Sequence, residues 1–265
     1  MEVILNGARI HYERSGAGFP LLFIHAGIAD ARMWKPQVEA WADRFDMIRS
    51  DLRGFGDSEL PPMSYSSRED LVGLLDHLRV NRAHVMGCSM GGTVALDLAL
   101  EHPERVERLV LVAGGISGSN LGDADAALFA DIETADKTGD LDAVNRAEVR
   151  LWVDGPGRPE GSAPAAVRNL VLDMNGRSLH SDWAAADHKD LDPPAISRLG
   201  DIKAPTLVIV GDQDLPHASA NANVITSKVP NARRATIRDA AHLPSLERPE
   251  EFNRLVLEFL TEKSG

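Results

Sequence analysis

The segment from residue 85 to residue 100 constrains the fold more than any other part of the chain. It begins with a strand pattern, continues into a Gly-x-Ser-x-Gly turn and ends with an apolar helix pattern over residues 93–100. Gly87 and Gly91 stand on either side of Ser89, at positions where any Cβ would collide with the neighbouring backbone. A serine on such a sharp strand-to-helix turn exposes its hydroxyl above a sheet, beside the positive end of a helix dipole. This local structure suits a nucleophile.

Apolar runs typical of buried strands alternate with helix patterns through the first half of the chain. The strand-like runs are residues 21–25, 47–51, 84–86 and 109–112. The helix-like segments between them include residues 67–78 and 93–102. This alternation predicts an α/β fold with a mostly parallel central sheet and helices on both of its faces. An Asn6-Gly7 pair within residues 3–13 predicts an antiparallel hairpin at one edge of the sheet.

The middle of the chain lacks the strand pattern. Helical stretches rich in alanine, aspartate and leucine take its place at residues 124–137, 141–153 and 165–179. Strand patterns return at residues 206–210 and 234–237, and an amphipathic helix pattern follows at residues 249–262. We therefore expect a helical cap of residues 117–199, inserted into a core of residues 1–116 and 200–265.

The net charge of −12 argues against nucleic acid or an anionic membrane as a partner, because binding to phosphates needs clustered basic residues. The single Cys88 rules out an intramolecular disulfide and favours a reducing compartment. The first residues carry no secretory signal pattern, and no apolar stretch approaches the length of a membrane span. We expect a cytoplasmic protein whose partner is a small molecule, with no nucleic-acid or membrane partner; a homodimer stays an open alternative.

A serine nucleophile needs a base and an acid that orients the base. Among nine histidines, His242 is the candidate base, because it follows the last strand pattern in a loop where the sites of open α/β sheets collect. Asp212 and Asp214 both follow the strand pattern of residues 206–210. We favour Asp214, since Asp212 lies so close to the strand that a turn or capping role explains it.

Attack on a carbonyl also needs donors that face the developing oxyanion. One candidate is the backbone N–H of Met90, the residue after the nucleophile. The second is the backbone N–H of Gly27, in the loop after the strand pattern of residues 21–25, where the missing side chain lets a substrate approach the amide.

Several of these features are motifs that follow one another along the chain, with the serine first, the acid second and the histidine third among the candidate catalytic residues. They are residues 25–27, residues 51–58, the serine turn at 87–92, the acidic segment 211–214 and His242. Together they resemble the α/β-hydrolase fold superfamily, and specifically its cap-bearing serine hydrolases, which include carboxylesterases, enol-lactonases and C–C bond hydrolases. The resemblance implies that Asp51 and Arg53 form a structural turn and that His25 hydrogen-bonds the oxyanion loop. Ala26 departs from the family pattern, which usually has glycine there.

The resemblance and the candidate residues together predict a serine hydrolase that cleaves a small carboxylic ester or lactone without a cofactor. The sequence contains no His-Glu-x-x-His or Cys-x-x-Cys pattern for a catalytic metal and no P-loop or G-x-G-x-x-G pattern for a nucleotide. Three alternatives stay open: a C–C bond hydrolase, a cofactor-free perhydrolase, and a small-molecule sensor with a slow or inert triad. Leu243 weakens the first, because many C–C hydrolases have tryptophan after the histidine.

We expect the cap to fold over Ser89 and to form the substrate pocket with the neighbouring loops. The expected lining residues are His25, Ile28, Phe129, Trp152, Met174, Trp183 and Leu243. Packing within the cap and the core is the alternative interpretation of each of them.

Overall fold

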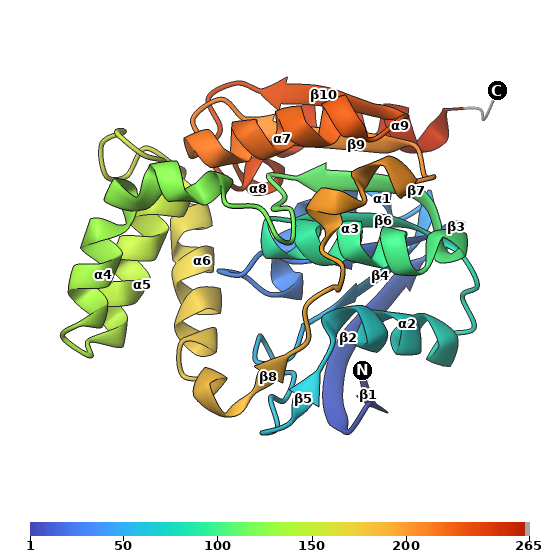
Figure 1. The fold of residues 1–265 in the computed structure, drawn as a ribbon, viewed down its shortest axis with the longest axis horizontal. Coiled ribbons are helices and arrows are strands. Elements are labelled where there is room, and N and C mark those ends of the chain that lie inside the picture. The colour runs from blue at the N-terminus through green and yellow to red at the C-terminus, as the bar shows by residue number, and fades with distance from the viewer. Residues whose placement is uncertain (263–265) are drawn as a thin grey trace.

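The central element of the chain is an eight-stranded sheet with the strand order β1-β2-β4-β3-β6-β7-β9-β10 (Figure 1). The computed structural model describes residues 1–262, and it describes residues 121–124 by their backbone alone. The strands are β1 (Glu2–Leu5), β2 (Ala8–Gly16), β3 (Phe19–Ile24), β4 (Phe45–Ser50), β6 (Ala83–Cys88), β7 (Val106–Val112), β9 (Thr206–Gly211) and β10 (Ala232–Ile237). β1 and β2 form the predicted hairpin, β2 also pairs antiparallel with β4, and the remaining pairs are parallel. The predicted mostly parallel sheet is confirmed.

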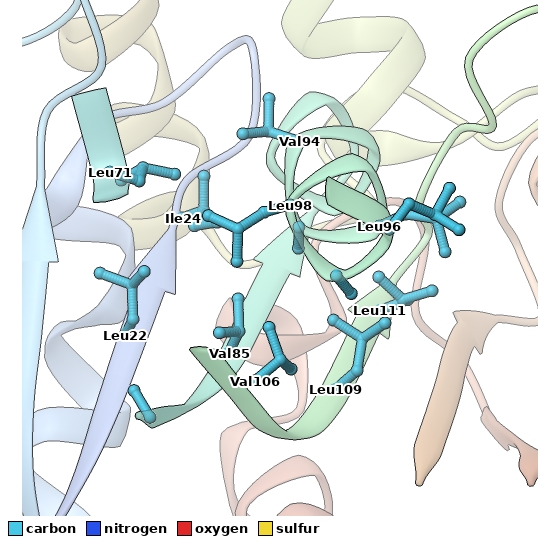
Figure 2. Close-up of a cluster of buried hydrophobic side chains, with 14 of the residues drawn as sticks. Leu22, Ile24, Leu71, Val85, Val94, Leu96, Leu98, Val106, Leu109 and Leu111 are labelled. Carbon is cyan, nitrogen blue, oxygen red and sulfur yellow. The ribbon is translucent and has the colours of Figure 1, made fainter. Parts of the chain in front are cut away.

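Helices cover both faces of the sheet, as predicted. One face packs against α2 (Ser67–His77), α3 (Met90–Glu101) and α7 (Pro216–Lys228), and the other against α1 (Lys35–Trp41), α8 (Pro244–Glu247) and α9 (Pro249–Thr261). Side chains alternate along each strand, so β3 directs Leu22 and Ile24 into the first core and Leu21 and Phe23 into the second. Figure 2 shows the first core, in which Ile24 lies between Leu71 of α2 and Leu98 of α3. No helix within residues 1–262 is long and apolar enough to cross a membrane.

Between β7 and β9 the chain forms a helical insertion. Its helices α4 (Ala130–Asp136), α5 (Leu141–Val149) and α6 (Ala165–Ser178) pack in sequence at one end of the sheet (Figure 1). The segment before α4, Leu121–Phe129, is a 3₁₀ helix, and α5 runs into the π-helical turn Arg150–Asp154. The short parallel pair of β5 (Ser64–Tyr65) and β8 (Asp187–His188) joins this insertion to the core. The limits of the cap at residues 117 and 199 stay a prediction.

The parallel strands bring the candidate site residues to one edge of the sheet. β6 ends at Cys88, directly before Ser89, and β9 ends at Gly211, three residues before Asp214. The loop after β10 leads to His242. Because β6, β7, β9 and β10 are neighbours in register, their carboxyl ends face the same side of the molecule.

Candidate active site

Ser89 lies on the tight turn between β6 and α3. Its backbone has φ 53° and ψ −117°, a conformation that non-glycine residues rarely adopt and that costs free energy. The Ser89 amide donates to the Val112 carbonyl oxygen over 2.8 Å, which fixes the turn to β7. A Cβ on Gly87 would overlap the Gly91 carbonyl, and a Cβ on Gly91 would overlap the carbonyls of Ile24 and His25. Both glycines are therefore required by close backbone contact, as the sequence predicted.

His242 is held by the carboxylate of Asp214. Its Nδ1 lies 2.9 Å from both Asp214 oxygens, and the two side chains are only 3% and 2% exposed. An ionised carboxylate only accepts, so Nδ1–H donates and Nε2 carries the lone pair. Nε2 is buried and has no hydrogen-bond partner among the described residues. Asp212, the alternative acid, has an exposed side chain and does not contact the ring.

Ser89 and His242 line one cavity of about 260 Å³, which we call the serine cavity. Met90 and Thr93 of α3 form part of its wall. The Ser89 hydroxyl does not cap α3, so its hydrogen-bonding capacity is not spent on the helix. The serine hydroxyl and the unpartnered imidazole nitrogen therefore belong to residues of the same small cavity.

The two candidate oxyanion donors lie against each other. A Cβ built on Gly27 would lie 3.6 Å from the Met90 Cβ, an ordinary contact distance. Within residues 1–262, neither the Gly27 amide nor the Met90 amide donates a hydrogen bond to another residue. Met90 is the first residue of α3, so its N–H also adds to the positive end of the helix dipole. Two neighbouring residues beside Ser89 thus have amides without acceptors, and binding of an oxyanion needs such donors.

His25 shapes the loop that carries Gly27. Its Nε2 accepts from the Leu52 amide at 2.9 Å, and its Nδ1–H donates to the Ala26 carbonyl at 2.8 Å. The ring is fully buried, and burial lowers its pKa, so it stays neutral in this role. Both ring nitrogens are occupied by the backbone, which supports a structural role, and the expectation that His25 also lines the substrate pocket stays a prediction.

The charged segment after β4 supports the same loop. One Asp51 oxygen accepts from the Ala31 amide at 2.8 Å and the other from the Asp57 amide at 2.9 Å. Arg53 forms a bidentate pair with Asp70, at 2.6 and 2.8 Å, in which both side chains are nearly inaccessible to water. These contacts give the segment the structural role that the resemblance implied.

The loop around His242 depends on a carboxylate that the sequence analysis missed. Glu247 accepts from the amides of Ala241 and Leu243, on either side of His242, at 2.9 and 3.0 Å. Burial raises the pKa of Glu247 to about 7. The cap holds the other side of the loop, since the His242 amide donates to the Trp152 carbonyl at 3.2 Å and the two rings lie 4.4 Å apart.

The remaining predicted pocket residues differ in their surroundings. Ile28, Met174 and Leu243 are buried at 8%, 0% and 0% exposure in one core cluster, and their role in a substrate pocket stays a prediction. Trp152 packs on His242, and Phe129 packs on Trp152 with ring centres 5.8 Å apart. Trp183 lines a second cavity of about 510 Å³, which we call the side cavity. The side cavity shares Met90 and Thr93 with the serine cavity.

A second imidazole–carboxylate pair faces the serine cavity. His217, at the start of α7, has Nδ1 2.7 Å from Asp125 Oδ2, and its amide donates to the same oxygen at 2.9 Å. Asn221, one turn further along α7, also lines the cavity, and its buried Oδ1 has no partner among the described residues. The position of His217, three residues after Asp214, was a usable signal in the sequence. Asp125 lies in the insertion, where nothing in the sequence marked it.

The fold corresponds to that of a known family. A family model described as alpha/beta hydrolase fold matches residues 20–249, and the chain belongs to this family. The 2-hydroxymuconate semialdehyde hydrolase of Pseudomonas sp. (strain CF600) is 40% identical, but the match spans only 44% of each chain. Carboxylesterase YbfK of Bacillus subtilis is 25% identical over 91% of this chain and 79% of its own. The enol-lactonase of Burkholderia xenovorans LB400 superimposes with a TM-score of 0.77 at 27% identity, covering 99% of this chain and 100% of the other.

Proposed function

We propose that the protein is a serine hydrolase that cleaves a small carboxylic ester or lactone through an acyl-enzyme, without a cofactor. The observation that carries this proposal is the orientation of His242. Asp214 holds Nδ1, while the unpartnered Nε2 is buried at the cavity that Ser89 also lines. The similarities to a carboxylesterase and an enol-lactonase agree with this reaction class.

The reaction follows from the position of each group. The Ser89 Oγ attacks the carbonyl carbon while His242 Nε2 takes its proton, and Asp214 stabilises the imidazolium that forms. The amides of Met90 and Gly27 bind the oxyanion. His242 then returns the proton to the leaving oxygen, the C–O bond breaks, and the acyl group stays on Ser89. A water molecule, deprotonated by His242, hydrolyses this acyl-enzyme and regenerates the serine.

The two cavities would bind different parts of the substrate. His242 lines the serine cavity and not the side cavity, and the leaving oxygen must come within reach of Nε2. We therefore assign the leaving alcohol to the serine cavity and the acyl chain to the side cavity, which opens beside the Met90 end of the site.

The test uses purified protein, a fluorophosphonate probe and a panel of short-chain esters and lactones. We expect rapid labelling of the wild type and hydrolysis of at least one member of the panel, and loss of both in Ser89→Ala. A wild type that is neither labelled nor active would refute the proposal and favour a small-molecule sensor. The same assays with 2-hydroxymuconate semialdehyde, or with added peroxide, test C–C hydrolysis and perhydrolysis, which the same triad can support.

A further inference from the structure

The side cavity has both apolar and charged residues in its wall. The apolar ones include Leu52, Phe55, Met90 and Val94, and Met90 also lines the serine cavity. Other lining residues of the side cavity include Arg53, Arg68 and Asp97. Thr93 and Asp97 follow Ser89 at intervals of four residues, so they lie on one side of α3. At a rise of 1.5 Å per residue, Asp97 lies about 12 Å along the helix from Ser89. An acyl chain that entered from Ser89 would pass the apolar wall and reach the charges.

Arg68 is a buried cation that no carboxylate contacts directly, although its charge acts on that of Asp97. It is only 8% exposed, and its Nη1–H donates to the Lys189 carbonyl at 3.2 Å. Its Nε has no hydrogen-bond partner among the described residues, and no carboxylate of those residues lies within 4.0 Å of its guanidinium. A buried charge without a partner is costly unless a ligand supplies one. The group therefore has capacity for an acceptor that comes from outside the chain.

Arg53 adds a second free donor to the same cavity. Its Nε and Nη2 are used by Asp70, but its Nη1 is buried and has no partner within the described part of the chain. Arg53 and Arg68 both line the side cavity, and the guanidinium group of each has an N–H group without an acceptor among the described residues. Guanidinium groups bind planar carboxylates well, because their donors match the two oxygens.

The neighbouring acids favour a ligand with a single negative charge. Asp97 is 6% exposed, accepts from Ser117 Oγ at 2.8 Å and has its pKa raised by burial. Asp190 also lines the cavity, and its Oδ1 lies 3.4 Å from His188 Nδ1. Both acids would repel a dianion such as a phosphate monoester more strongly than a carboxylate.

We propose that Arg68, assisted by Arg53, binds a carboxylate at the far end of the acyl chain, so that the substrate is a mono-ester of a dicarboxylic acid or a lactone that bears a free carboxylate. This inference rests on the proposed function, since it names the acyl group of that reaction. The charge of Arg68 opposes the rise that burial causes in the pKa of Asp97, so the two side chains are neighbours. Because Asp97 lies about 12 Å along α3 from Ser89, we expect acids such as suberate to be preferred over short ones such as succinate.

The experiment compares mono-p-nitrophenyl suberate with its methyl-capped counterpart, which lacks only the charge. We expect kcat/KM of the wild type to be about 10-fold to 100-fold higher for the free acid, as one charge-assisted contact allows. In Arg68→Gln this ratio falls toward one, mainly through KM, and the KI of free suberate as a competitive inhibitor rises by a similar factor. Asp97→Asn raises the ratio, because it removes a competing negative charge.

Arg254→Gln is the matched control, since it makes the same substitution on α9 at a side chain that is 67% exposed. It should keep the wild-type ratio, and thermal unfolding of each variant checks that it is folded. Equal kcat/KM for the two esters in an active wild type would overturn the carboxylate site and leave the proposed function intact. If no ester is hydrolysed, the proposed function fails, and calorimetry of suberate binding then tests the carboxylate site. Weaker binding in Arg68→Gln than in the wild type supports the site, and equal binding in both overturns it.

Discussion

Replacing Glu247 with glutamine removes a buried group that titrates near neutral pH. Burial raises the pKa of Glu247 from 4.5 to about 7, although the amides of Ala241 and Leu243 and the charge of Arg158 act in the opposite direction. Between these two values the folded protein keeps a proton that the unfolded chain has released. The free energy of unfolding therefore falls as the pH rises from about 4.5 to about 7, and the total loss from this one group is about 3 kcal/mol.

Glutamine keeps an oxygen that can accept from the two amides, but it does not titrate. We expect the wild type and Glu247→Gln to differ least at the acid end, where the glutamate is protonated. Between pH 5 and pH 8 the unfolding free energy of the variant should rise by about 2–3 kcal/mol relative to the wild type.

Urea denaturation at several pH values, followed by tryptophan fluorescence, measures this difference. Glu258→Gln, at an α9 side chain that is 67% exposed, is the control and should run parallel to the wild type. Parallel profiles for wild type and Glu247→Gln would refute the reasoning, because they would mean that the carboxylate stays ionised over this range.

Three further predictions concern the site. Gly87→Ala should abolish fluorophosphonate labelling, since the added Cβ overlaps the Gly91 carbonyl; the soluble yield and the labelled fraction measure this. Asp214→Asn should lower kcat by about 10⁴-fold by disturbing the tautomer of the base, whereas Asp212→Asn should stay within about 3-fold; comparable losses in the two variants would contradict the assignment of the acid. His217→Gln should change the preference between polar and apolar leaving alcohols by about 10-fold, because the ring faces the serine cavity; an unchanged ratio of kcat/KM values would exclude this contact.

The residues that could be predicted from the sequence occupy positions with a local signature. Ser89 follows a strand pattern and lies between two glycines that the turn requires. Asp214 and His242 were found because each follows a strand, and parallel strands bring their carboxyl ends to the same edge. The sheet was predictable for a related reason: strands buried on both faces appear as continuous apolar runs.

The pocket could not be predicted in the same way. Met174 and Leu243 are apolar because the interior of the protein needs them, and the sequence does not distinguish such residues from those that line a cavity. Arg68 and Asp97 lie on different helices, and only the packing of those helices brings both to the side cavity. The same holds for the pair of His217 and Asp125, which are 92 residues apart in the chain.

The contact between Trp152 and His242 has a consequence for how substrates enter. The Trp152 carbonyl accepts a hydrogen bond from the backbone of the histidine, and the two rings lie 4.4 Å apart, so the insertion helps to support the proposed base. If the whole insertion moved away from the core as a rigid body, it would displace His242 or break the hydrogen bond to its backbone. Under the proposed function, substrate access and proton transfer are therefore coupled, because His242 is held in position only while the insertion stays packed against it.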